Sequence, residues 1–187
     1  ELQIAADLVP GQLRTLALDL VENLHARFKT DYVLTVQDDG FPLRPGLGEF
    51  VGKFDYVGAP WERHMTVYDF YPGKYRVGNG GFSLRSKRLC VEASRLYRKW
   101  FKWMPYWWYL LGDDTFYCKT LRFWFPQVGR SFRWATVDEA ASFSKENAAG
   151  MLEVKSLPLG FQGEVGWRNV RQLALSADLE RRQTVLR

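Results

Sequence analysis

The chain has 187 residues, of which 47% are hydrophobic, and a formal net charge of +5. That length supports one well-buried core and is short for two, so we expect a single domain over residues 1–187. No apolar run reaches the roughly 18 residues of a membrane-spanning helix, and the first residues, ELQIAADLVPGQ, do not resemble a signal peptide. The two cysteines, Cys90 and Cys118, lack the paired spacing of a zinc site. We therefore expect a soluble cytoplasmic protein, which could sit at the inner face of the membrane.

The positive charge comes from 26 Lys and Arg residues against 21 acids, and the basic residues are spread along the chain. Such a mild excess suits a phosphate-bearing ligand or an anionic surface and does not predict nucleic-acid binding. Four of the eight tryptophans fall within Trp100–Trp108. This aromatic run fits a wall for a sugar acceptor, a peripheral membrane patch or a dimer contact, and the sequence does not choose among them or predict an oligomeric state.

The first predicted element is an amphipathic helix from Pro10 to Phe28, which should pack on the sheet. His25 lies beside its apolar stripe and has no second histidine one turn away, so we interpret it as a residue at the surface or core edge. The apolar residues that define the stripe recur at steps of three and four: Leu13, Leu16, Ala17, Leu20, Val21, Leu24 and Phe28.

A buried strand is predicted from Tyr32 to Val36, where no polar alternation interrupts the apolar run. We expect both of its faces to be covered, as in a central strand of an α/β sheet. Gln37, Asp38, Asp39 and Gly40 follow at its carboxyl end, where such sheets place their ligands. Two carboxylates beside a turn suit Mg²⁺ or Mn²⁺ completed by substrate phosphates. An ordinary Asp-Gly turn is the alternative.

Residues 41–54 are rich in Pro and Gly and predict a loop over this site, with Phe50 and Phe54 turned inward. A short strand follows at Tyr56 and Val57, and residues 58–61, which end at Trp61, predict a tight turn. Residues 62–75 have no clear period, and their residues able to bind polar ligands cannot be ranked. These are His64, Tyr68, Asp69 and Tyr71.

The second distinctive stretch is Gly78–Gly81, a turn that we expect to use positive φ and to lie flat beneath a substrate. A strand at Phe82–Leu84 and a helix capped by Ser86 come next, with the helix running to Trp100. Arg85 precedes that helix. It could pair with the turn carboxylates, bind a diphosphate, or lie at the surface.

Asp113 or Asp114 is predicted to cap a helix that runs to Leu121, although a carboxylate there could also act as a general base. A strand at 133–135 follows. Thr136 and Glu139 then form a capping-box pattern for the next helix. Residues 160–163 predict a loop, and the tail from Asn169 predicts a helix. Together the order of elements predicts a mixed α/β layer structure.

The motifs TDYVLTVQDDGF, FDYVGAPW, VGNGGFSLRS, DDTFYC, DEAASFS and GFQG occur in that order. This series resembles the DUF5672 family of glycosyltransferase-like domains, and the similarity covers about residues 30–163, with the helical tail at 168–187 outside it. The resemblance implies a GT-A-like fold, in which a mixed sheet is flanked by helices. It also implies transfer of a sugar from a nucleoside diphosphate donor to a hydroxyl acceptor with inversion.

By the same resemblance, Gln37 and Asp39 correspond to the Asp-x-Asp motif of GT-A enzymes, and Asp39 with Asp38 would hold a divalent cation, Mn²⁺ or Mg²⁺. Asn79, Gly80 and Gly81 would form the floor of the donor and acceptor site. The remaining assignments place Trp61, Arg85 and Gln162 at that site, Asp114 as the base for the acceptor hydroxyl, and Asp113 in place of the usual glutamate.

Two departures from the family pattern stand out. Gln162 occupies the place of a histidine, and family members carry further strands before the first helix, whereas this chain starts almost at that helix. The strands could be lost, supplied by a longer protein, or replaced in some other way. The sequence thus supports a metal-dependent glycosyltransferase, with a non-catalytic carbohydrate-binding or scaffolding domain as the alternative. It does not specify the sugar, the base or the acceptor, or decide between inverting and retaining transfer.

Overall fold

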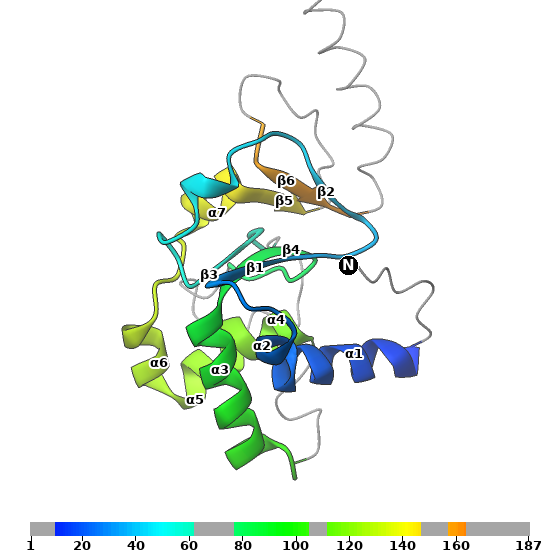
Figure 1. Cartoon of the computed structure of the whole chain (residues 1–187), viewed down its shortest axis with the longest axis vertical. Coiled ribbons are helices and arrows are strands. Elements are labelled where there is room, and N and C mark those ends of the chain that lie inside the picture. The colour runs from blue at the N-terminus through cyan, green and yellow to red at the C-terminus, as the bar shows by residue number, and fades with distance from the viewer. Residues whose placement is uncertain (1–9, 62–76, 105–111, 147–156, 164–187) are drawn as a thin grey trace, which may run out of the picture.

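The structure is a computed structural model, and it describes residues 10–61, 77–104, 112–146 and 157–163. Figure 1 shows these residues in three layers, with helices below a first sheet and a second sheet with α7 above it. The first sheet has the strand order β1–β4–β3, and the second has the order β2–β6–β5. The expected mixed α/β architecture is therefore confirmed.

The strands are β1 (Tyr32–Val36), β2 (Gly40–Pro42), β3 (Tyr56–Gly58), β4 (Phe82–Ser86), β5 (Ser144–Glu146) and β6 (Gly160–Gln162). The α-helices are α1 (Pro10–Glu22), α2 (Leu24–Arg27), α3 (Lys87–Leu96), α4 (Asp113–Thr115), α5 (Leu121–Trp124), α6 (Pro126–Ser131) and α7 (Val137–Phe143). A 3₁₀ turn, η1 (Leu47–Glu49), and two π-helical turns, η4 (Tyr97–Phe101) and η6 (Phe116–Thr120), complete the described elements.

The centre of the first sheet is β4, which pairs antiparallel with both β1 and β3. All five residues of β4 are buried, whereas four of the five in β1 are only half-buried and Val36 is exposed. The prediction that Tyr32–Val36 is the central strand is therefore wrong within the described residues. The physical reason is that β4 carries two serines and Arg85, so its sequence hides how deeply it is buried.

Side chains on the first sheet alternate between two cores, as the pleat requires. Val33 and Tyr56 face the helices, where they pack with Leu89 of α3. Leu34 and Leu84 face the opposite way and pack with Phe143 of α7. Each face of β1 thus packs against a core, but the strand is only half-buried and Val36 is exposed, so the predicted burial is confirmed in part. Phe50 and Phe54, from the predicted loop at 41–54, also belong to the second core, which confirms that they turn inward.

Several predicted helix boundaries are confirmed and others are corrected. Ser86 caps α3 by accepting a hydrogen bond from the Leu89 N–H, and Thr136 with Glu139 forms the capping box of α7. The predicted helix over 10–28 is interrupted at Asn23, whose φ and ψ of −122° and −10° are not helical. The N-cap residue of α4 is Gly112, which makes no side-chain cap hydrogen bond, so neither Asp113 nor Asp114 is the predicted N-cap.

The second sheet contains the main error of the sequence prediction, because residues 160–162 form β6 and not a loop. This strand pairs antiparallel with β2 and parallel with β5. Three residues are too few for a periodic signal, and the two flanking glycines are typical of a turn. Gly160 is required because a Cβ there would lie 2.1 Å from Phe82 Cε1, where the two sheets meet. The strand expected at 133–135 is only a single bridge between Trp134 and Tyr56.

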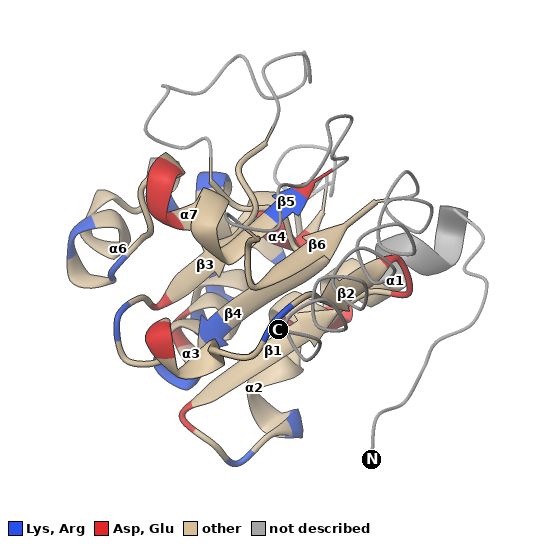
Figure 2. Cartoon of the chain, turned by 90° about the horizontal axis from the view of Figure 1, so that it is seen from above, with Lys and Arg blue, Asp and Glu red and all other residues tan. Residues whose placement is uncertain are grey.

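Figure 2 shows acidic and basic residues interspersed around the described elements and not separated into two halves. Cys90 and Cys118 are both buried and free, so they form no disulfide. Among the described helices, none is long and apolar enough to cross a membrane. The ligand-binding candidates at 62–75, the 105–108 part of the aromatic run and the predicted tail helix lie outside the described residues.

Candidate functional site

The turn after β1 contacts the glycine-rich stretch that precedes β4. The Gln37 N–H donates to the Gly81 carbonyl oxygen at 2.7 Å, and the Gly40 N–H closes the turn on the Gln37 oxygen at 2.9 Å. A Cβ at Gly40 would lie 2.7 Å from the Gly81 oxygen, so only glycine permits this approach. Two motifs that are 40 residues apart in the sequence therefore share one site.

The glycines at 80 and 81 provide space rather than unusual dihedral angles. Within the Gly78–Gly81 stretch only Gly78 has a positive φ, so the expectation of positive φ is wrong for Gly80 and Gly81. A Cβ at Gly81 would lie 1.9 Å from Gln162 Nε2, and one at Gly80 would lie 3.0 Å from Asp114 Cβ. The Asn79 side-chain oxygen accepts from the Gly81 N–H at 2.9 Å. Asn79, Gly80 and Gly81, the predicted floor, therefore lie together. The side chains of Gln162 and Asp114 cover Gly81 and Gly80.

Gln162 of β6 covers this floor. Its Nε2 donates to Gln37 Oε1 at 3.0 Å, which links the second sheet to the turn after β1. Its own Oε1 is buried and has no hydrogen-bond partner among the described residues. Gln162 therefore lies beside Gln37 and Gly81.

Asp38 and Asp39 lie on the outer side of the turn, where Asp38 is exposed and Asp39 is half-buried. Asp38 Oδ1 accepts from the Asp39 N–H at 3.1 Å, and the Asp39 carbonyl accepts from Gly163. The described residues contain no group of three or more His, Cys, Asp or Glu side chains that could hold a metal ion. This donor set fits a Mg²⁺ or Mn²⁺ ion that takes its other ligands from phosphate and water, and not an all-protein metal centre.

Arg85 is completely buried on the helix-facing side of β4. Its Nη2 bonds to Asp113 Oδ2 at 2.5 Å, and its Nε donates to Ser83 Oγ at 3.0 Å. The guanidinium carbon lies 5.4 Å from the ring centre of Tyr56 and 4.9 Å from that of Tyr117. Neither a surface position nor pairing with the turn carboxylates is correct, because the partner is Asp113.

The charge of Arg85 is fixed by these neighbours. Burial alone would lower the pKa of Arg85, but the Asp113 carboxylate acts together with Tyr56, Tyr117 and Cys90 to outweigh it and hold that pKa well above its usual value. Its Nη1 is buried without a hydrogen-bond partner in the described part of the chain. Arg85 is thus a permanent cation inside the domain.

A short polar track joins Arg85 to the glycine stretch. Ser83 Oγ and Thr35 Oγ1 lie 2.6 Å apart, and both hydroxyls also lie within hydrogen-bond distance of the Gly80 carbonyl. The track fixes the Gly80 carbonyl against the sheet. It also makes β1, β4 and the Gly80 turn one connected unit.

Asp113 and Asp114 occupy the start of α4 but have different surroundings. Asp113 is nearly buried and paired with Arg85, while Asp114 is half-buried and its Oδ1 accepts from the Thr115 N–H at 2.6 Å. Burial, reinforced by the neighbouring Asp113 charge, raises the pKa of Asp114 to about 6. A carboxylate with that pKa is ionised at neutral pH and is also a competent proton acceptor, which is how a general base is tuned.

Trp61 does not lie on the surface of this site. Only 2% of it is exposed, Lys119 Nζ lies 4.4 Å from its ring centre, and a Cβ at Gly78 would lie 2.6 Å from the edge of the ring. In this conformation the tryptophan belongs to the core beneath the Gly78 turn. The sequence predicted that Trp61 contacts the donor or acceptor, but almost none of its ring is exposed in this structure.

Asp55, which precedes β3, is a buried charge that the sequence prediction missed. Ser86 Oγ donates to its Oδ1, the Arg133 N–H donates to its Oδ2, and Arg88 bonds to both oxygens. Burial alone would raise the pKa of Asp55, but these donors together lower it below its usual value. The sequence signal that could have found this residue is its position directly before a short apolar strand.

The family comparison covers most of the chain. The pattern of the family described as "Protein of unknown function (DUF5672)" matches residues 8–162. The match begins about twenty residues earlier than the predicted 30–163 range, so α1 and α2 fall within it. No curated protein and no solved structure matches this chain. The residues assembled around the Gly80 turn therefore lie within a chain that belongs to the DUF5672 family.

Proposed function

We propose that this domain is a glycosyltransferase that moves a sugar from a nucleoside diphosphate donor to a hydroxyl acceptor with inversion. The observation that carries the proposal is the raised pKa of Asp114, about 6, on an aspartate whose Cβ lies beside Gly80 of the glycine turn. A half-buried acid with a shifted pKa beside convergent polar groups is typical of a catalytic site.

Asp114 is the general base of the proposed reaction. Its Oδ1 is engaged by the Thr115 N–H, which leaves the second oxygen to take the acceptor proton. The acceptor oxygen then bonds to the anomeric carbon, while the bond from that carbon to the diphosphate oxygen breaks and the nucleoside diphosphate leaves with the electron pair. Asp114 carries the proton away.

Asp113 and Arg85 position the base. Their bond of 2.5 Å anchors the start of α4 to β4, and Gly80 packs against both Asp114 and this pair. Asp113 therefore serves as the anionic partner of Arg85 and not as a second base. Its negative charge also helps to raise the pKa of Asp114.

Asp39 and Asp38 are the residues that would hold a divalent cation, with Gln37 beside them. Such an ion supplies positive charge that stabilises a departing diphosphate. Because Asp38 is exposed and Asp39 half-buried, both lie on a surface that a diphosphate can approach.

A second candidate is a non-catalytic carbohydrate-binding or scaffolding domain, and one observation favours it. The Gln162 amide lies where a Cβ of Gly81 would be, so it covers the surface on which a ligand would rest. The enzyme proposal requires Gln162 to move when the donor binds. The alternative lets it remain in place.

The deciding experiment is a thermal-shift panel of nucleoside diphosphates and their sugars with and without Mn²⁺, followed by transfer assays with the donor that binds. A ligand that binds only the native state raises its stability. We expect a metal-dependent shift that Asp39→Ala removes, and an Asp114→Asn variant that binds donor but turns over about 10²–10⁴-fold more slowly.

Asp138→Asn, an exposed aspartate on α7, is the matched control and should behave like the wild-type protein. The wild-type rate should fall as the pH drops through 6, because the base becomes protonated. Sugar binding without donor hydrolysis or transfer at any pH would instead favour the non-catalytic candidate.

A further inference from the structure

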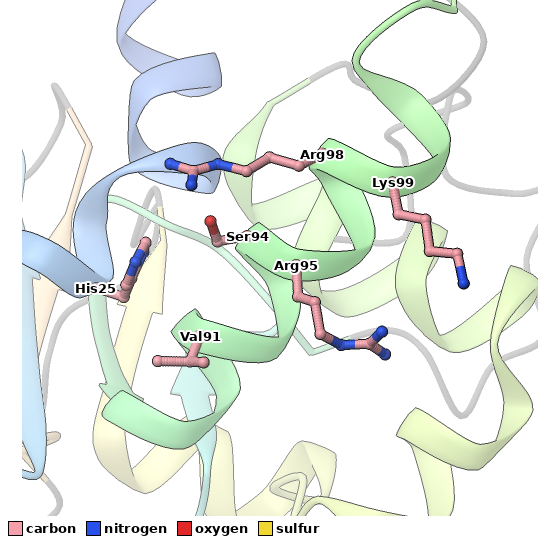
Figure 3. Close-up of a pocket in the computed structure, with 6 residues that line it drawn as sticks. All are labelled: His25, Val91, Ser94, Arg95, Arg98 and Lys99. Carbon is pink, nitrogen blue, oxygen red and sulfur yellow. The ribbon is translucent and has the colours of Figure 1, made fainter.

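The exposed face of α3 and η4 carries a stripe of positive charge. Arg95, Arg98, Lys99 and Lys102 are spaced by three and four residues, so they share one side of the helix, and all four are exposed. Figure 3 shows the first three of them around a hollow of about 450 Å³ between α2 and α3. His25 lies on the opposite side of this hollow, at the core edge that the sequence predicted.

Few acids offset this stripe. Glu92 bonds to Arg95, and Glu22 bonds to both Arg98 and Lys102. No described carboxylate forms an ion pair with Lys99, whose Nζ lies 5.1 Å from the ring centre of Trp100. Four cations therefore face solvent with only two carboxylates beside them, which suits an anionic partner.

Two tryptophans stand at the end of the same stripe. Trp100 is 53% exposed and Trp103 is 85% exposed, although tryptophan is mostly buried in folded proteins. Figure 1 shows that α3 runs away from both sheets, and η4 and the turn after it, which carry Trp100 and Trp103, form a tip of the described structure. Indole rings next to lysine and arginine are the combination that settles at the water–lipid boundary, where the ring is half-apolar and the cations meet phosphates.

We propose that the exposed face of α3 and η4, with Trp100 and Trp103 at the tip, docks on an anionic phospholipid bilayer. The two rings enter the headgroup zone, while Arg95, Arg98, Lys99 and Lys102 contact the lipid phosphates. In this arrangement the helical face lies on the bilayer surface. This inference rests on charge and exposed aromatic surface alone, so it stands whether or not the proposed sugar transfer is correct.

The test is flotation of the purified protein with vesicles of phosphatidylcholine, with or without phosphatidylserine. We expect binding to the vesicles that contain phosphatidylserine, with a loss of about tenfold or more in Trp103→Ala and in Lys99→Glu. Trp124→Ala is the matched control, because Trp124 is a tryptophan of 55% exposure on α5, and it should bind like the wild-type protein.

Three results would overturn the proposal. One is no binding to phosphatidylserine vesicles by wild-type protein, and another is equal loss in Trp103→Ala and Trp124→Ala. The third is concentration-dependent self-association in sedimentation experiments, without vesicle binding, that Trp103→Ala abolishes. That outcome would make the tip a contact between copies of the chain. Circular dichroism of each variant confirms that it is folded.

Discussion

Two buried charge clusters pack against the first sheet, and they differ in how completely their charges are compensated. The Asp55 carboxylate receives donors on both oxygens from Ser86, Arg88 and Arg133, and the pKa of Asp55 is lowered. In the other cluster, two neighbouring acids, Asp113 and Asp114, share Arg85, and the pKa of Asp114 is raised.

The difference is consistent with a structural role for the Asp55 cluster and with the proposed catalytic role of Asp114. A saturated carboxylate has no capacity left for chemistry, and its charge stabilises the fold. A carboxylate whose charge is under-compensated costs stability and gains basicity, which is the usual trade at a catalytic site. Substitutions in the two clusters should therefore affect stability with opposite signs.

The largest expected effect is from Asp55→Ala, which should destabilise the domain by about 3–5 kcal/mol because several donors lose their only buried acceptor. Urea unfolding followed by circular dichroism measures it. Asp55→Asn should also destabilise the domain. Its loss of stability relative to the wild-type protein should become smaller as the pH falls below the pKa of Asp55 in the unfolded chain. A neutral effect of Asp55→Ala at pH 7 would remove this residue from its structural role.

Asp114→Asn should change the free energy of unfolding in the opposite direction. A raised folded-state pKa means that the ionised carboxylate costs stability fully above pH 6, and that the cost disappears below the unfolded pKa near 3.8. The variant should therefore be more stable than wild type by about 2–3 kcal/mol at pH 8. The difference should vanish near pH 3. Urea unfolding across that pH range measures it, and destabilisation at pH 8 would contradict the assignment.

A smaller effect is expected at the glycine turn. Gly81→Ala should cost about 1 kcal/mol, because the clash is with the end of the flexible Gln162 side chain, which can swing away and lose its bond to Gln37. Gly58→Ala is the matched comparison. A Cβ there would lie 2.1 Å from the Asn79 backbone oxygen, which cannot swing away. Thermal unfolding should rank Gly58→Ala as clearly worse, and equal losses would mean that Gln162 is held rigidly.

The sequence predicted much of this arrangement where a residue type signals its own role. The Ser86 cap and the capping box at Thr136 were correct because local hydrogen bonds decide them. The strand at Tyr32–Val36 was correct because its β-branched and aromatic composition signals a strand, although its partner β4 is distant in sequence. The family resemblance assigned Gln37 and the glycine turn to one site, and the two stretches are in contact in the structure.

What could not be predicted depends on contacts between distant segments. The Arg85–Asp113 pair spans 28 residues of sequence, and either partner could equally have lain at the surface. The burial of Trp61 and the strand β6 likewise depend on which segments pack over them. Side-chain polarity misled the prediction for β4, because the helix-facing serine and arginine of this strand are paired inside the protein.

The most direct measurement is an NMR titration of the aspartate side-chain carboxyl carbons, with Asp55 and Asp114 assigned by substitution. The account predicts a midpoint near 6 for Asp114 and one below the usual aspartate value for Asp55 in the same spectra. A midpoint for Asp114 at or below 4 would leave no carboxylate tuned as a base at this site, and it would contradict the proposed role of Asp114.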